Sequence, residues 1–286
     1  MLTRRQFTST ALTATALSGL RGFSGLYAAE PKKKRASKYI DMHTHIGTTW
    51  NGNKELTPKG LLEWMGLPYT HSGLFASALA MDKERSKAAY RAAGLPVAES
   101  RLASKADVMA GHVLSPPYVV KPYNEGSSVG VYLVHDAANG LPALSDEMPD
   151  TVMVEAFVPG RELTATVLGD RTLTVTDIVT DGWYDYDAKY KPGGSRHVVP
   201  AEIPAQIFEA CLDYAERAHR ILGCRGISRT DFRWDETRGL DGLILLETNT
   251  QPGMTPTSLS PEQGESVGIS FGRMCRQLVE DASCNR

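Results

Sequence analysis

An apolar run that ends in a carboxylate, an amide and a tight turn constrains this chain more than any other feature. The run covers residues 245–253 and reads LLETNTQPG. Side chains two positions apart in a β-strand point to the same face, so Glu247 and Asn249 would present two oxygen donors side by side. Mg²⁺ prefers such donors and is usually held by one or two carboxylates together with phosphate oxygens. The run therefore predicts a metal-binding strand end, with a further acidic residue on a neighbouring strand.

The segment 226–234 supplies that acidic residue. The same alternation places Arg229 and Asp231 on one face, a cation beside an expected metal ligand. Such a pair suits phosphoryl transfer, where catalysis is mostly positioning and neutralisation of charge on the transferred oxygens. The alternative interpretation is a solvated strand end with ordinary charges. From the residues alone we favour the metal site.

Composition narrows the class of protein. The 286 residues are 42% hydrophobic and 22% charged, which is typical of a soluble globular protein of about two domains. A net charge of −2 gives no broad basic field, so we expect no nucleic-acid partner. The four cysteines have no zinc-binding spacing, and we interpret them as free thiols: Cys211, Cys224, Cys275 and Cys284.

The first 59 residues differ in character from the rest. Residues 1–30, with Arg4 and Arg5 before a short apolar run, resemble a twin-arginine export signal. That run is too short and too rich in threonine and serine to span a bilayer, so we expect no stable membrane insertion. Residues 31–59 read as a linker and a fragment in which His43 and His45 resemble the first metal-binding strand of the amidohydrolase superfamily. The later ligands of such a barrel are missing, so a metal-dependent hydrolase is only an alternative.

Three further segments have a clear pattern. Residues 118–121 form a short β-branched run, continue into the Gly- and Ser-rich stretch 125–130 and emerge as a second run at 131–134, which predicts a hairpin. Its polar tip is of a kind that can close over phosphates, and an ordinary surface hairpin is the equal alternative. The stretch lacks the Gly-Lys-Ser/Thr of a Walker A loop, so a P-loop nucleotidase is disfavoured. Residues 204–222 predict an amphipathic helix that ends at Gly223, and the stretch 182–190 predicts a loop.

These motifs occur together with several others in a recognisable order. From about Gly60 to Arg286 the chain resembles the D-alanine–D-alanine ligases of the ATP-grasp superfamily. The resemblance rests on the segments 60–63 (GLLE), 68–70 (PYT), 78–83 (ALAMDK), 121–130 (KPYNEGSSVG), 159–162 (PGRE), 184–190 (YDYDAKY) and 247–259.

The resemblance implies an α+β chain with the ATP-grasp fold, in which two α+β subdomains sandwich a nucleotide. It further implies that 60–82 is a remnant of the family's N-terminal lobe, 83–158 the central subdomain, and 159–286 the C-terminal subdomain with the metal and catalytic site. Most of the N-terminal lobe is missing, and residues 1–59 offer no match for its substrate-binding glutamate. A nucleotide-binding remnant without turnover is therefore the second alternative.

The resemblance also implies a role for each site residue. The residues expected to bind ATP are Lys83, Lys121, Glu155, Ala156, Phe157, Val158, Glu162 and Lys189. The residues expected to act in catalysis are Arg229, Ser127, Tyr190 and Gly253. Ser258 and Leu259 would contact the second substrate, and Asp231, Glu247 and Asn249 would hold the metal.

The implied reaction is the ATP-dependent joining of two D-alanine molecules through an acyl phosphate, in peptidoglycan precursor synthesis. Its cofactors would be ATP and Mg²⁺, with Mn²⁺ as an alternative metal, and the resembled ligases are commonly homodimers. A reaction that consumes ATP belongs in the cytoplasm, whereas the twin-arginine-like N-terminus leaves export to the periplasm open.

Overall fold

The computed structural model describes residues 58–126, 130–136, 141–180 and 195–284. All elements described below belong to one compact unit, Tyr39–Arg286. The export-signal resemblance and the fragment with His43 and His45 lie outside the described residues. The same holds for three expected site residues, which are Ser127, Lys189 and Tyr190.

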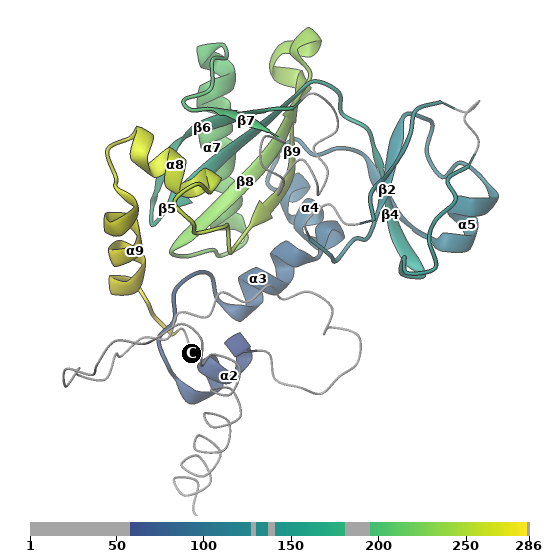
Figure 1. The fold of residues 1–286 in the computed structure, drawn as a ribbon. Helices are drawn as coiled ribbons and strands as arrows, with labels where there is room; N and C mark the ends of the chain where they lie inside the picture. Colours follow the sequence, from purple (N-terminus) through teal and green to yellow (C-terminus); the bar gives the residue numbers. More distant parts are fainter. Residues whose placement is uncertain (1–57, 127–129, 137–140, 181–194, 285–286) are drawn as a thin grey trace, which may run out of the picture. The chain divides into compact units, whose positions relative to one another are not determined.

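The larger sheet has five antiparallel strands in the order β7-β6-β5-β8-β9 (Figure 1). Its strands are β5 (Arg161–Leu168), β6 (Arg171–Val179), β7 (Arg196–Val198), β8 (Ile227–Trp234) and β9 (Leu243–Asn249). A 3₁₀ segment, η2 (Glu236–Gly242), connects β8 to β9. The segment 96–97 lies alongside the outer edge of β9, since Leu245 N–H donates to the Pro96 carbonyl at 2.9 Å.

One face of this sheet is apolar and packs on α7 (Ala205–Ile221). Leu163, Ala165 and Phe232 from the sheet are fully buried with Cys211 and Ala218 of the helix. Burying one such large apolar side chain contributes roughly 1.5–3 kcal/mol. The predicted amphipathic helix is therefore confirmed, and it ends as expected, with the next residue but one, Gly223, at φ +70°.

The opposite face of the sheet is polar near its middle and is covered at one end by α8 (Leu259–Ser266) and α9 (Phe271–Glu280). The register between β5 and β6 breaks between Ala165 and Val167. There the buried Gln263 of α8 takes the place of a strand neighbour: its Oε1 accepts from Thr166 N–H at 2.8 Å and its Nε2 donates to the Thr164 carbonyl at 3.1 Å. The side-chain amide thus satisfies backbone groups that the bulge leaves unpaired.

The smaller sheet has four antiparallel strands in the order β1-β4-β2-β3. They are β1 (Ser100–Ser104), β2 (Tyr118–Lys121), β3 (Tyr132–Val134) and β4 (Thr151–Ala156), and α5 (Lys105–Ala110) follows β1. Val108 of α5 is buried with Val120 and Val154 on one face. The predicted hairpin is confirmed, because β2 and β3 pair with Val120 opposite Tyr132.

In the described part of the chain, the strands are preceded by the helices α2 (Pro58–Met65), α3 (Leu74–Met81) and α4 (Lys83–Ala92). The side chain of Asp82 caps α4 by accepting from Arg85 N–H at 3.0 Å. The fully buried Tyr90 then ties α4 to β9, since its hydroxyl donates to Thr248 Oγ1 at 2.9 Å. Helices combined with two antiparallel sheets give the α+β class that the sequence predicted. Within the described residues, every helix is too short or too polar to cross a bilayer.

Candidate active site

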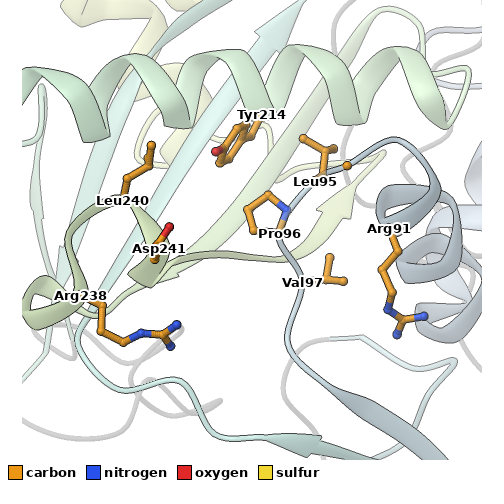
Figure 2. A pocket seen from close by; sticks show the side chains of 9 residues that line it. Arg91, Leu95, Pro96, Val97, Tyr214, Arg238, Leu240 and Asp241 are labelled. Carbon is orange, nitrogen blue, oxygen red and sulfur yellow. The ribbon is translucent and has the colours of Figure 1, made fainter.

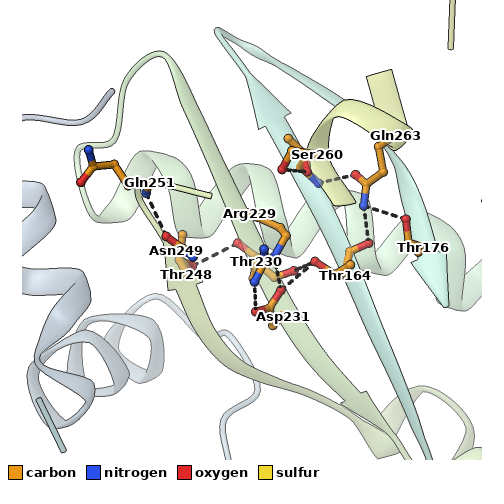
Figure 3. Close-up of polar contacts among 11 residues, drawn as sticks. Thr164, Thr176, Arg229, Thr230, Asp231, Thr248, Asn249, Gln251, Ser260 and Gln263 are labelled. Atoms are coloured by element: carbon orange, nitrogen blue, oxygen red, sulfur yellow. Dashed lines mark hydrogen bonds and ion pairs between the residues drawn. The ribbon is translucent and has the colours of Figure 1, made fainter. Parts of the chain in front are cut away.

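A row of polar side chains crosses three strands of the larger sheet. Thr164 of β5, Asp231 of β8 and Glu247 of β9 stand directly opposite one another in the strand register. Arg229 and Asn249 form the next row on β8 and β9. Figure 3 shows Arg229, Asp231 and Thr164 turned toward one another, with Asn249 on the neighbouring strand. The sequence prediction that the strands bring Arg229, Asp231, Glu247 and Asn249 to one face therefore agrees with the register.

A bulge in β9 decides which face Glu247 occupies. Asp231 pairs with Glu247, but the next residue, Phe232, pairs with Leu245, so Leu246 is one residue in excess. Unbroken alternation from the buried Leu245 would place Glu247 on the apolar face. The extra residue instead moves the carboxylate to the polar face, which is a common use of bulges near functional sites. Sequence alternation correctly related Glu247 to Asn249 but gave no signal for the bulge.

Each expected metal ligand already has a polar partner in the protein. Arg229 makes a two-pronged ion pair with Asp231, with Nε to Oδ1 and Nη2 to Oδ2 both at 2.8 Å. Lys83 Nζ lies 3.2 Å from Glu247 Oε2. Asn249 Oδ1 accepts from Gln251 N–H at 2.9 Å. Both carboxylates of the site are therefore paired with cations of the chain itself.

The donors fit a hard divalent cation. Two carboxylates and an amide oxygen are the ligands that Mg²⁺ or Mn²⁺ takes, and neither a thiolate nor an imidazole belongs to the set. In the part of the chain that the structure describes, no three side chains of His, Cys, Asp or Glu gather into a metal-binding group. Asn249, in the next row of the same strands, adds an amide oxygen beside the two carboxylates.

A second charged cluster lies against the smaller sheet. Glu155 of β4 is only 3% exposed, and its two oxygens contact different lysines: Oε1 contacts Lys87 of α4, and Oε2 contacts Lys121 of β2. Burial favours the neutral acid, but Lys121 and Lys87 outweigh it and lower the pKa of Glu155 below its usual value. Burial in turn lowers the pKa of Lys87, although Glu155 opposes the shift.

Lys87 was missed by the sequence prediction, whereas Lys121 and Glu155 were expected as separate nucleotide contacts. The available signal was helical spacing. Lys83 and Lys87 are four residues apart on α4, so both point to the same side of the helix. What the sequence lacked was the partner, because Glu155 follows 68 positions later in the chain.

Four of the expected nucleotide contacts lie in or beside the segment that joins the two sheets, from the end of β4 to the start of β5. Ala156 N–H donates to the Glu99 carbonyl at 2.9 Å, and Phe157 N–H donates to the Pro117 carbonyl at 3.0 Å. The Val158 carbonyl accepts from Arg233 Nε at 3.1 Å. Arg233 also reaches Glu162, with Nη1 to Oε2 at 3.5 Å, so one guanidinium connects Val158 to Glu162.

Gly160 fixes the path of this segment. Its φ of +94° lies in the region that favours glycine, and a Cβ there would overlap the carbonyl oxygen of Trp234. The segment therefore crosses from one sheet to the other in close contact with the end of β8.

Gly253, Ser258 and Leu259 come together beyond the end of β9. A Cβ on Gly253 would lie 2.9 Å from Ser258 Oγ, so glycine permits the close approach. Ser258 stands at the N-terminus of α8, and its Oγ accepts from Thr255 N–H at 3.1 Å. Leu259 is buried. Gly253 and Ser258 are thus adjacent, as the predicted substrate contacts require.

A separate cleft of about 620 Å³ opens between the end of α4, α7 and η2. Figure 2 shows Arg91, Tyr214 and Arg238 around it, with Val97 beside them. None of the site residues named above lines this cleft. The chemistry-bearing side chains therefore lie outside it, along the sheet faces that meet α4.

Comparison with known proteins places the chain among named relatives. The family model described as "D-ala D-ala ligase C-terminus" matches residues 90–280. The D-alanine–D-alanine ligase of Ruegeria sp. (strain TM1040) is 74% identical over 228 residues, which are 80% of this chain and 74% of that protein. The ligase of Roseobacter denitrificans is 75% identical over 228 residues, covering 80% of this chain and 72% of its own length.

Solved structures agree with these relatives. The D-alanine–D-alanine ligase from Bacillus anthracis, complexed with ATP, superposes with a TM-score of 0.63 at 27% identity, over 78% of this chain and 73% of that one. The VanG D-Ala:D-Ser ligase from Enterococcus faecalis superposes with a TM-score of 0.67 at 29% identity, over 79% of this chain and 68% of its own.

Proposed function

The chain belongs to the D-alanine–D-alanine ligase family, and we propose that it joins two D-alanine molecules into a dipeptide in a reaction driven by ATP, for peptidoglycan precursor synthesis. One observation carries the proposal. Arg229, Asp231, Glu247 and Asn249 share one sheet face, and Lys83 reaches the same face from α4. Carboxylates that can hold a metal, beside cations that can neutralise phosphate oxygens, are what phosphoryl transfer to a carboxylate requires.

Asp231, Glu247 and Asn249 would hold Mg²⁺, or Mn²⁺ in its place. When bound there, the metal supplies positive charge that neutralises the phosphate oxygens of ATP during transfer. With Glu247 engaged as a metal ligand, Lys83 would be available to neutralise a phosphate oxygen. Lys121 and, from the loop 182–190, Lys189 would also contact phosphates as point charges.

The adenosine part of ATP would lie at the connection between the sheets. Glu155 and the backbone of Ala156, Phe157 and Val158 would contact the adenine. Glu162 would accept hydrogen bonds from the ribose hydroxyls, a task that suits a carboxylate with two acceptor oxygens. Arg233 supports this placement, since it already orients both Val158 and Glu162.

The reaction would proceed in two steps. A carboxylate oxygen of the first D-alanine attacks the γ-phosphorus of ATP, and ADP leaves. The amine of the second D-alanine then attacks the acyl carbon, phosphate leaves, and the amine loses a proton to give the peptide bond. Arg229 and the Gly253 N–H would stabilise the oxyanion of the tetrahedral intermediate, and removing one such donor typically costs about 3 kcal/mol.

The remaining predicted residues would position the substrates. Ser127 and Tyr190 would act in catalysis, with Tyr190 favouring D-alanine as the second substrate, and Ser258 and Leu259 would contact the carboxylate of that second substrate. We propose that the ligase works in the cytoplasm, where ATP is present, and that it forms a homodimer.

The test is D-alanine-dependent phosphate release and dipeptide formation with Mg-ATP. We expect Glu247→Gln to abolish both, because it removes a charged metal ligand. Glu265→Gln makes the same change of charge at an exposed position of α8 and should leave both unchanged. If the folded protein binds Mg-ATP but forms no dipeptide, the ligase proposal fails and nucleotide binding without turnover replaces it.

A further inference from the structure

We propose that Lys87 is a positioning residue that holds the Glu155 carboxylate and thereby allows Lys121 to leave it for the phosphates of ATP. This inference rests on the proposed function, in which Lys121 binds phosphate. It assigns a task to the one member of the buried cluster that is outside the predicted nucleotide contacts. Lys87 acts through Glu155 and touches neither ATP nor the reacting atoms.

Burial distinguishes the two lysines that share Glu155. The side chain of Lys87 is 1% exposed, whereas that of Lys121 is 14% exposed. In its present rotamer Lys87 therefore reaches neither solvent nor a ligand, and its ammonium group contacts Glu155 Oε1. Lys121 is the last residue of β2, and its side chain is the more exposed of the two.

The two carboxylate oxygens make this exchange feasible. Each oxygen of Glu155 has its own lysine, so the departure of Lys121 vacates Oε2 and leaves the Oε1 contact intact. A buried carboxylate that loses its last cation is strongly destabilised. With Lys87 present the carboxylate keeps a counter-charge, and the vacated Oε2 becomes an acceptor for the nucleotide. Without Lys87, Lys121 is the only lysine of this cluster that can pair with the buried carboxylate. Lys121 then stays on Glu155 and does not bind phosphate.

Helix α4 provides the framework for this arrangement. Lys83 lies one turn before Lys87 and pairs with Glu247, while Tyr90 fastens the same helix to Thr248. Because α4 is anchored on β9, it presents a fixed Lys87 to β4. The larger sheet therefore fixes the position of Glu155 through α4 and Lys87, although Glu155 itself belongs to the smaller sheet.

The experiment compares wild type, Lys87→Met, Glu155→Gln and the double variant. Methionine keeps the length of the side chain and removes its charge. We expect Lys87→Met to raise KM for ATP at least tenfold and to change kcat by less than twofold, because the retained Lys121 must be released before ATP binds. In the Glu155→Gln background, Lys87→Met should change KM for ATP by less than twofold, because there is no carboxylate left to position. Lys87→Arg, which keeps the charge, should restore most of the affinity.

Two results would overturn the proposal: an unchanged KM for ATP in Lys87→Met, or a full tenfold effect of Lys87→Met in the Glu155→Gln background. If Lys87→Met alone does not fold, Lys87→Gln takes its place in the whole comparison, because it keeps a hydrogen-bond donor for Glu155 Oε1 and removes the charge. If the wild type lacks turnover, the proposed ligase reaction has failed separately. The Kd of Mg-ATP, measured by calorimetry on the same variants, then replaces KM as the readout.

Discussion

Replacing Lys83 with methionine should change metal affinity and nucleotide affinity in opposite directions. Lys83 Nζ lies 3.2 Å from Glu247 Oε2, so in the absence of ATP a divalent cation must displace the lysine to reach that carboxylate. Lys83→Met removes this competitor and should strengthen metal binding without nucleotide. The same change removes a cation from the phosphate site and should weaken the binding of Mg-ATP.

The magnitude follows from the geometry of the ion pair. Coulomb attraction across 3.2 Å amounts to about 1.3 kcal/mol in water and about 5 kcal/mol at the effective dielectric constant of a protein surface. The Glu247 side chain is 34% exposed, so solvent screens much of this attraction. We take about 1–2 kcal/mol, which corresponds to roughly a tenfold gain in metal affinity. A loss of about tenfold or more is expected for Mg-ATP.

The assay is a titration with Mn²⁺, followed through the paramagnetic resonance signal of the free ion, with and without ATP. Arg85→Met is the matched control, because Arg85 lies on the same helix with its side chain 80% exposed and carries the same charge. It should move neither affinity by more than about twofold, as expected for an exposed surface charge. If Lys83→Met weakens metal binding without nucleotide, or leaves it unchanged, the idea that this lysine competes with the metal is refuted.

Three further changes test the fold. Burial is the main cause, and the charge of Arg220 the second, of a fall in the pKa of His219 from 6.5 to about 4. The folded protein therefore favours the neutral imidazole. The stability that depends on this neutral form is complete above pH 6.5 and is lost as the pH falls toward 4. His219→Gln should remove from the urea-unfolding curves a pH dependence on the order of 3 kcal/mol. Gln263→Met should cost about 2–4 kcal/mol in the same assay, because it leaves buried backbone groups of β5 without partners. Gly160→Ala should cost about 2 kcal/mol or more, because of its positive φ and the overlap with Trp234.

Each of these has a definite contrary outcome. A wild type whose stability falls no faster between pH 7 and 5 than that of His219→Gln would show that the imidazole is protonated in the fold. Gln206→Met, at an exposed position of α7, is the control for Gln263→Met, and equal effects of the two would remove any special role for the buried amide. A Gly160→Ala variant as stable as wild type would mean that the connection between the sheets adjusts easily.

Local pattern was enough to predict much of the candidate site. The alternation of Glu247 with Asn249 and of Arg229 with Asp231 depends only on the two-residue period of a strand, and all four side chains do share a face. The helix before Gly223 and the hairpin around 125–130 likewise followed from periodicity and from glycine positions. The family resemblance supplied the α+β class, which no single pattern in the chain specifies.

The rest depends on contacts between residues far apart in the chain. The pairing of Lys87 with Glu155 spans 68 positions, and that of Gln263 with Thr166 spans 97. Neither residue type reveals its partner, since lysine and glutamine are ordinarily exposed. The bulge at Leu246 is also invisible in the sequence, because an apolar run looks the same whether its strand pairs evenly or carries one extra residue. The roles expected for all the site residues stay predictions, and Ser127, Lys189 and Tyr190 also lie outside the described ranges.

The extra residue in β9 has a consequence for how this strand tolerates genetic change. Leu246 fills the bulge, so loss of its codon would leave Leu245 opposite Phe232 and Glu247 opposite Asp231 in an evenly paired strand. Glu247 would stay on the polar face, because it would then follow the core residue Leu245 directly. Loss of Thr248, by contrast, would turn Asn249 to the apolar face. A deletion of one residue in β9 should therefore be tolerated at Leu246 and harmful at Thr248.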